Sequence, residues 1–174
     1  KWELSLGLRS DSIHTSFTQM AANGAVTNLA QVNNVLNYNA GLVFKPAHNG
    51  SIYINRGTSF NPSAEGISLT APTTNLDPEK NTIYEIGTKW DLFKKRVSTA
   101  FALFRIDKDN ARESINATTT LLSGSQRVNG FTAQISGKVT NNWNIMAGYS
   151  YLDSQLTKSA INPAFVGRRL ANTP

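Results

Sequence analysis

The feature that most constrains the fold is a strict alternation of apolar and polar side chains along much of the chain. In residues 2–9, Trp2 and three leucines alternate with charged, hydroxyl or small residues. The same alternation recurs in residues 37–45, 52–54, 84–92, 97–103, 131–139 and 143–151. Successive side chains of a β-strand point to opposite faces, so the pattern predicts strands with one apolar and one polar face. No stretch of comparable length has helical periodicity, and we expect an all-β chain of about seven antiparallel strands.

The connections between these strands alternate in length. Three are short, at residues 46–50, 93–96 and 140–142. Four are expected to be long polar loops, at residues 10–36, 57–81, 108–125 and 154–170. Outer-membrane barrels have tight periplasmic turns and long extracellular loops. The sequence therefore predicts a segment of an antiparallel transmembrane β-barrel with its short turns in the periplasm.

Aromatic side chains fall into two layers under this orientation. One layer, near the periplasmic ends of the strands, holds Trp2, Phe44, Trp90 and Trp143. The other layer, near the outer ends, holds Tyr38, Tyr84 and Tyr151. Amphipathic rings favour the lipid headgroup level, so we expect two aromatic girdles with lipid against the apolar face between them. The face rich in Gly, Ser, Asn and Gln would then line a wet or plugged interior.

Composition narrows the class further. Only 16% of the residues are charged, the formal net charge is +6, and cysteine is absent. The basic balance favours anionic partners such as lipid phosphate, nucleic acid or an acidic small molecule. No run of 18 apolar residues is present to form a transmembrane helix. The chain also opens without a signal peptide, so we expect either a cytosolic protein or an interior portion of a longer one.

Two blocks of sequence resemble the barrel of TonB-dependent siderophore receptors. The first is Lys45-Pro46 followed by SIYINRGTSFNPS at residues 51–63, and the second is LDPEK at residues 76–80 leading into YEIGTKWD at residues 84–91. The similarity continues in residues 102–108, 126–131, 143–153 and 167–174. Within the family, the GSQRVNGF and AGYSYLDS segments are most similar to catecholate-type receptors.

This resemblance implies a barrel of about twenty-two strands with a plugged lumen, of which residues 1–174 would supply a part. The plug domain, the segment that binds the TonB energy-coupling protein, and the closing C-terminal strands would lie outside this chain. The implied function is energy-coupled uptake of a ferric siderophore through the outer membrane of a Gram-negative cell. The siderophore would be the transported ligand, and no cofactor is expected.

Candidate ligand contacts follow from the chemistry of that substrate. Ferric catecholates are anionic, and arginine is the usual anchor for delocalised negative charge. The predicted ligand-binding residues near the outer rim are Arg56, Arg105, Arg112, Arg127, Arg168, Arg169 and Phe60. Weaker candidates in the same regions are Arg9, Phe17 and Phe165. The alternative is that the arginines are solvated loop charges or partners of outer-membrane lipid and lipopolysaccharide phosphate, and that the phenylalanines pack within their loops.

Other recognisable residues point to structure. Glu85, Lys89 and Asp91 share one face of a predicted strand, and we expect their charges to line the interior or face the plug. The two histidines, His14 and His48, fall at opposite ends of the predicted barrel, so no metal site or catalytic triad can include both. Nucleic-acid-binding motifs are likewise absent from the sequence. We therefore expect no enzyme; the alternatives are a passive porin or substrate-specific channel, or a soluble β-sandwich binding module.

Overall fold

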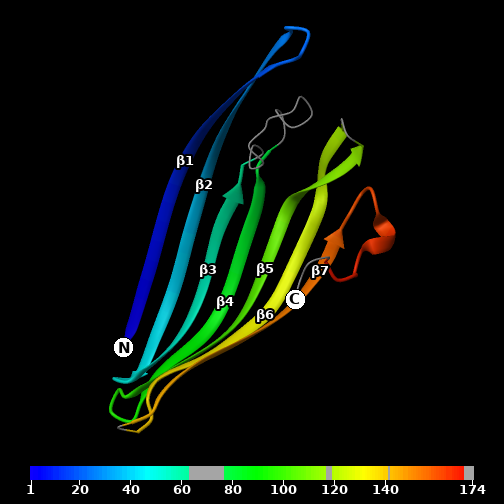
Figure 1. The fold of residues 1–174 in the computed structure, drawn as a ribbon. Coiled ribbons are helices and arrows are strands. Elements are labelled where there is room, and N and C mark those ends of the chain that lie inside the picture. Colours follow the sequence, from blue (N-terminus) through cyan, green and yellow to red (C-terminus); the bar gives the residue numbers. More distant parts are fainter. Residues whose placement is uncertain (63–76, 117–118, 141, 171–174) are drawn as a thin grey trace.

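The computed structural model describes residues 1–62, 77–116, 119–140 and 142–170. These residues form one sheet of seven strands, each antiparallel to the next in chain order (Figure 1). The strands are β1 (Trp2–Met20), β2 (Val26–Ala47), β3 (Gly50–Asn61), β4 (Glu79–Leu92), β5 (Val97–Asn116), β6 (Thr119–Lys138) and β7 (Asn144–Lys158). A short 3₁₀ helix, η1 (Pro163–Phe165), follows β7. The predicted all-β chain of about seven antiparallel strands is confirmed.

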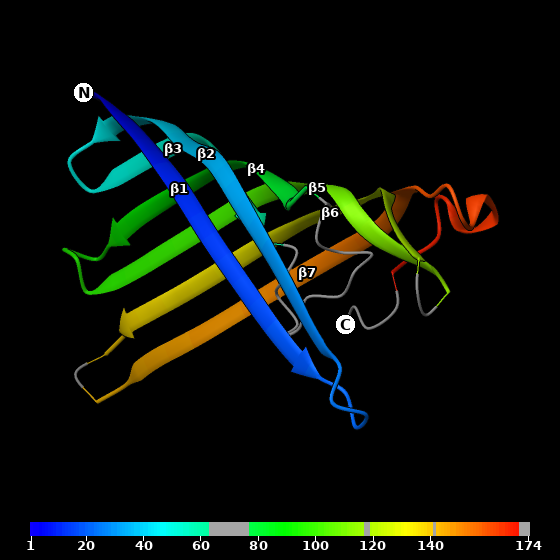
Figure 2. The same ribbon diagram turned by 90° about the horizontal axis from the view of Figure 1, so that it is seen from above.

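The sheet is a single curved layer, with β1 and β7 at its two edges (Figure 2). Among the described residues, the buried apolar side chains are only Val97, Ala102 and Ala111. Larger apolar side chains point away from the sheet, and Leu4, Leu6 and Leu8 are 69%, 72% and 78% exposed. Removing such a side chain from water is worth about 1.5–3 kcal/mol. A sheet of this kind therefore needs an apolar environment against one face.

Strand register assigns the side chains to two faces, because cross-strand partners point to the same side. One face, the apolar face, carries a continuous row formed by Leu4, Leu42, Ile54, Ile86, Leu103, Phe131 and Tyr151. The adjacent row points to the other face, the polar face, and includes Ser5, Gly41, Asn55, Glu85 and Gly130. The alternation in the sequence thus corresponds to one apolar and one polar surface.

The short connections gather at one end of the sheet (Figure 1). The β4–β5 turn holds Phe93, Lys94 and Lys95 at φ of 50°, 56° and 67°, in the left-handed region. Next to it, the ring of Trp90 covers Gly50 so closely that a Cβ at Gly50 would lie 2.1 Å from a ring carbon. The predicted short connections at residues 46–50 and 93–96 are confirmed, and Asn141 of the third, at residues 140–142, lies outside the described residues. A glycine is required under the tryptophan.

The predicted aromatic layers lie toward opposite ends of the strands. Trp2 contacts Phe44 with ring centroids 4.5 Å apart, near the short turns, and Trp143 accepts a backbone hydrogen bond from Val139 in the β6–β7 turn. Tyr84 lies six residues from Trp90 along β4, toward the opposite end of the strand. The apolar face is thus bordered by tryptophans at the short-turn end and by tyrosines at the other.

The prediction of long polar loops was wrong for most of residues 10–36 and 108–125, which belong to paired strands, and for the ends of 57–81 and 154–170. β1 and β2 continue to Met20 and Val26 and pair throughout, with Thr15 opposite Gln31. β3, β4, β5, β6 and β7 also extend into residues expected to form loops. Beyond the apolar part of the sheet both faces of a strand meet water, so the apolar alternation ends there. The backbone pairing does not depend on that alternation and continues. Residues 63–76 of the predicted 57–81 loop lie outside the described residues.

Within the described ranges, no helix is long and apolar enough to cross a membrane.

Candidate functional site

A charged cluster lies on the polar face at the end of the sheet away from the short turns. Glu79, at the start of β4, is 6% exposed, and its Oε2 lies 2.7 Å from Nζ of Lys108 on β5. The backbone N–H of Arg112 donates to Oε1 of Glu79 over 3.1 Å. Burial works against ionisation of Glu79, but these two hydrogen bonds hold the pKa of its carboxyl below the ordinary value. The cluster is therefore held together by a buried carboxylate at neutral pH.

Arg112 adds a cationic group to this cluster. Its terminal guanidinium nitrogen donates to the carbonyl oxygen of Pro62 over 2.7 Å. Its Nε is buried and has no hydrogen-bond partner among the described residues. A buried donor without a partner costs about 1–3 kcal/mol, so an acceptor supplied by a ligand would relieve that cost. Arg112 is therefore a cation of the cluster with one donor that no described residue satisfies.

A second group of arginines lies on the apolar face. Register places Arg56 opposite Tyr84, and Tyr84 opposite Arg105, so all three point to the same side as the row of Ile54, Ile86 and Leu103. The guanidinium carbon of Arg56 lies 5.3 Å from the Tyr84 ring centroid and 5.4 Å from that of Tyr38. We call Arg56, Tyr84 and Arg105 the arginine rim.

Arg105 and Arg127 share a carboxylate just beyond the arginine rim. Nε of Arg105 lies 2.8 Å from Oδ2 of Asp107, and Nε of Arg127 lies 2.6 Å from Oδ1. The single carboxylate of Asp107 therefore forms ion pairs with two guanidinium groups. The part of the chain that the structure describes offers no ion-pair partner to Arg56.

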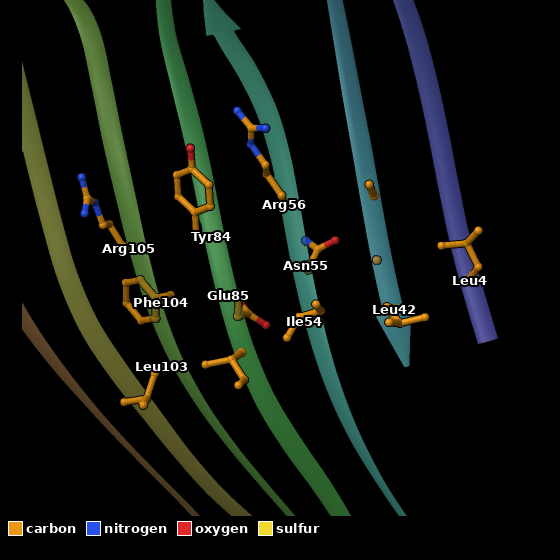
Figure 3. Close-up of a pocket in the computed structure, with 13 residues that line it drawn as sticks. Leu4, Leu42, Ile54, Asn55, Arg56, Tyr84, Glu85, Leu103, Phe104 and Arg105 are labelled. Carbon is orange, nitrogen blue, oxygen red and sulfur yellow. The ribbon is translucent and has the colours of Figure 1, made fainter. Parts of the chain in front are cut away.

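A shallow groove runs along the apolar face directly below the arginine rim (Figure 3). We call it the apolar groove; its wall is formed by Leu4, Leu42, Ile54, Ile86 and Leu103. Figure 3 shows Arg56, Tyr84 and Arg105 in a row along one side of it, on β3, β4 and β5. The arrangement places a strip of apolar side chains beside a row that carries two cations.

The remaining arginine and phenylalanine candidates are dispersed. Arg9 pairs with Asp11 at 2.7 Å and lines a cleft that also includes Phe60, formed where pairing of β2 with β3 ends at Asn39 and Gly57. Phe17 lies on β1.

The segment after β7 holds three further candidates. Arg168 covers the ring of Phe165 at 5.1 Å, and Arg169 follows directly. Gly167 and Arg168 form backbone hydrogen bonds with Leu156 of β7. Sequence reasoning found these residues by charge and loop position, but it missed Glu79 and Lys108, because their pairing across strands leaves no local signal.

The predicted stripe of Glu85, Lys89 and Asp91 does share the polar face. Tyr53 donates its hydroxyl to Glu85 over 2.6 Å, and Nζ of Lys89 lies 5.3 Å from the Tyr53 ring centroid. Ser98 donates to Asp91 over 2.6 Å. These contacts join adjacent strands and serve the sheet itself.

The two histidines lie at opposite ends of the sheet, His14 on β1 and His48 in the β2–β3 turn. Among the described residues, no group of histidine, aspartate and glutamate could hold a metal ion.

Comparison with known proteins decides between the membrane and soluble alternatives. Residues 1–174 match the family described as TonB dependent receptor-like, beta-barrel. The chain belongs to the TonB-dependent receptor β-barrel family. It is 39% identical over 167 residues to the probable TonB-dependent siderophore receptor PiuA of Acinetobacter baumannii, covering 91% of this chain and 22% of that protein. It is 30% identical over 176 residues to the catecholate siderophore receptor Fiu of Escherichia coli, covering 86% of this chain and 23% of that protein.

A solved structure supports the same assignment. The crystal structure of the Acinetobacter baumannii receptor PiuA aligns with a TM-score of 0.92 and 34% sequence identity, covering 100% of this chain and 27% of the receptor. The chain therefore spans about a quarter of the length of the relatives it matches. TonB-dependent receptors are outer-membrane barrels that act as receptors and transporters, so the expectation that the chain is not an enzyme is confirmed.

Proposed function

We propose that the chain forms part of the barrel wall of a receptor for energy-coupled uptake of ferric siderophores across the outer membrane of a Gram-negative cell. The observation that carries this proposal is the similarity to siderophore receptors over the whole sheet, including a TM-score of 0.92 to PiuA. In the complete receptor, a plug domain and further strands outside residues 1–174 would close and fill the barrel. The TonB energy-coupling protein would act through a region outside this chain.

The two faces support a division of roles. The apolar face would contact lipid, because its leucines and isoleucines are exposed in the isolated sheet. The polar face would line the plugged interior, and Glu85, Lys89 and Asp91 would face the plug. The tight turns would lie in the periplasm, which places the cluster of Glu79, Lys108 and Arg112 at the extracellular end.

Among the predicted ligand-binding residues, Arg112 has the strongest support as a siderophore contact. It belongs to the polar-face cluster, and its buried Nε has no acceptor among the described residues. Phe60 and Arg9 line one cleft, but Phe60 has the strand parity of Arg56 on the apolar face, whereas Arg9 alternates with Leu8 and belongs to the polar face. Of the two, Arg9 could bind an anionic ligand. Arg168 and Arg169 would contribute from the segment after β7. Similarity to Fiu favours a catecholate as the siderophore.

Uptake of iron by whole cells tests the proposal. Cells that express the complete receptor should accumulate radiolabelled iron from a ferric catecholate more than from a ferric hydroxamate. Accumulation should stop when the TonB protein is deleted or the proton gradient is collapsed, because passage requires displacement of the plug. A passive porin would conduct without either, so uptake that persists under both treatments would contradict the proposal.

A further inference from the structure

Asparagine is followed directly by glycine at three places in the chain, at residues 23–24, 49–50 and 129–130. This dipeptide can react with itself, because the backbone nitrogen of the glycine can attack the side-chain amide carbon of the asparagine. Glycine has no Cβ to hinder that approach. The attack also requires the backbone between the two residues to rotate, so the fold decides which of the three pairs can react.

The first pair, Asn23 and Gly24, forms the tip of the β1–β2 hairpin. Figure 1 shows this tip beyond the ends of the other strands. Both residues are exposed, and a Cβ built on Gly24 would meet no atom within 4 Å. Strand pairing ends at Met20 and Val26, so the peptide between Asn23 and Gly24 lies outside the ladder of the sheet.

The geometry of this turn favours attack on the asparagine side chain. The backbone N–H of Ala25 donates to Oδ1 of Asn23 over 3.1 Å. A donor on that oxygen stabilises the negative charge that develops there when the amide carbon is attacked. Gly24 has a φ of 81°, and its N–H donates to the carbonyl oxygen of Ala21 over 2.9 Å. This exposed turn hydrogen bond has to open before the nitrogen of Gly24 can react.

The second pair, Asn49 and Gly50, is held by the neighbouring β4 strand. Nδ2 of Asn49 donates to the carbonyl oxygen of Asp91 over 2.9 Å, and the N–H of Asp91 donates to the carbonyl oxygen of Asn49 over 2.7 Å. Gly50 lies opposite Trp90 in the β3–β4 ladder, and the Trp90 ring covers it. Both the amide group that would leave and the residue that would attack are therefore fixed.

The third pair, Asn129 and Gly130, lies in the middle of β6. This strand pairs with β5 on one side and with β7 on the other, where Gly130 lies opposite Phe104 and Leu152. Rotation of the backbone at this point would break hydrogen bonds of the ladder. The sheet therefore opposes the reaction at Asn129, although its side chain is exposed.

We propose that Asn23 is a site of spontaneous deamidation and that the fold protects Asn49 and Asn129. Hydroxide removes the proton from the backbone amide of Gly24, and the nitrogen forms a bond to Cγ of Asn23. The bond from Cγ to Nδ2 breaks, and ammonia leaves with a proton taken from water. A second water molecule then opens the cyclic imide at either carbonyl carbon, which gives aspartate or isoaspartate at position 23.

The reaction would change the charge of the hairpin. Residues 15–44 contain no Asp, Glu, Lys, Arg or His, so the new carboxylate would be the only side-chain charge in that segment. Isoaspartate also lengthens the main chain of the turn by a carbon atom, and loop length helps to fix the register of a hairpin. The tip is extracellular in the proposed orientation, so an aged receptor would differ from a new one on its outer surface. The reaction itself does not depend on which ligand the receptor transports.

Ageing of the complete receptor in detergent at mildly alkaline pH tests the proposal. Samples taken over time are digested under acidic conditions, and mass spectrometry measures the deamidated fraction of the three peptides. Asn23 should react at least about ten times faster than Asn49 and Asn129, because hydrogen bonds of the sheet must break before the other two react. Methylation by isoaspartyl methyltransferase should label the peptide that contains position 23. Equal rates in the folded receptor, or a faster reaction at Asn49 or Asn129, would overturn the proposal.

The same receptor unfolded in urea is the matched control, because its three Asn-Gly pairs are then free of the fold. Their rates should approach one another in urea. A preference for Asn23 that is as large in urea as in the folded receptor would show that the neighbouring sequence causes it, and would overturn protection by the fold. The variant N23Q should lose the fast reaction and leave the two slow ones unchanged. Heat-modifiable gel mobility confirms that the receptor stays folded during ageing in detergent.

Discussion

Arginine substitution at Ile86 tests the orientation of the apolar face quantitatively. Ile86 is 50% exposed in the sheet and lies two residues from Tyr84 and four from Trp90 on β4. At a rise of about 3.3 Å per residue, it lies about 7 Å along the strand from the tyrosine girdle. Arginine on the lipid face costs about 2–4 kcal/mol at the midplane and about 0–1 kcal/mol near the interfaces. We expect I86R to lower the free energy of unfolding by about 2 kcal/mol, which is about thirtyfold in the equilibrium constant.

The assay is denaturant unfolding of the complete receptor in lipid bilayers, followed by tryptophan fluorescence. Gln134 provides a matched control, because it is exposed and lies on the polar face opposite Ala100 and Gly148. Q134R should change the free energy of unfolding by no more than about 0.5 kcal/mol, because a charge on the polar, hydrated lumen side avoids the lipid. Equal destabilisation by I86R and Q134R, or a larger effect of Q134R, would refute the assignment of the two faces.

Three further predictions concern single residues. The pKa of Glu79 is lowered in the folded state, so its carboxylate stabilises the fold at pH values above the unfolded pKa near 4.5, and this stabilisation is lost as the pH falls through the lower folded pKa. The difference in thermal midpoint between the unmodified receptor and E79Q should therefore shrink as the pH falls below 4.5. A difference that stays constant with pH would contradict the buried ion pair. G50A should destabilise the receptor by about 1–3 kcal/mol, because its Cβ would clash with the ring of Trp90, whereas G148A, with no atom nearer than 4.0 Å, should unfold at nearly the unmodified denaturant concentration. R112Q should weaken ferric catecholate binding by about 1.5–3 kcal/mol in equilibrium titration, the value of a charge-assisted hydrogen bond, and an unchanged Kd would exclude Arg112 from the ligand site.

The strands and their two faces could be predicted from the sequence because lipid imposes a strict rule on one side of each strand. Leu4, Leu6 and Leu8 follow that rule without exception. The rule ends where both faces meet water, which is why the paired extension of β1 and β2, with Thr15 opposite Gln31, was predicted as a loop. Polar strands outside the membrane have no periodic signal for sequence reasoning to detect.

The candidate site was predictable in composition but not in geometry. The arginines are predicted from their charge and from their position near the outer ends of the strands, and Arg56 does lie at the level of Tyr84. The face on which Arg56 lies could have been predicted, because residues two apart on a strand point to the same side and Arg56 continues the series of Ile52 and Ile54. The contact between Arg112 and Glu79 could not, because it joins residues 33 positions apart and follows irregular pairing between Lys108 and Ala111.

The proposed function depends on the apolar face meeting lipid while the polar face meets a wet interior. Nitroxide labels at single cysteines along residues 4–8 of β1, in a cysteine-free complete receptor, measure this directly through collisions with oxygen and with a water-soluble nickel chelate. The labels at Leu4, Leu6 and Leu8 should collide mainly with oxygen, and those at Ser5 and Gly7 mainly with the chelate. Uniform accessibility along the strand, or the opposite alternation, would contradict the account.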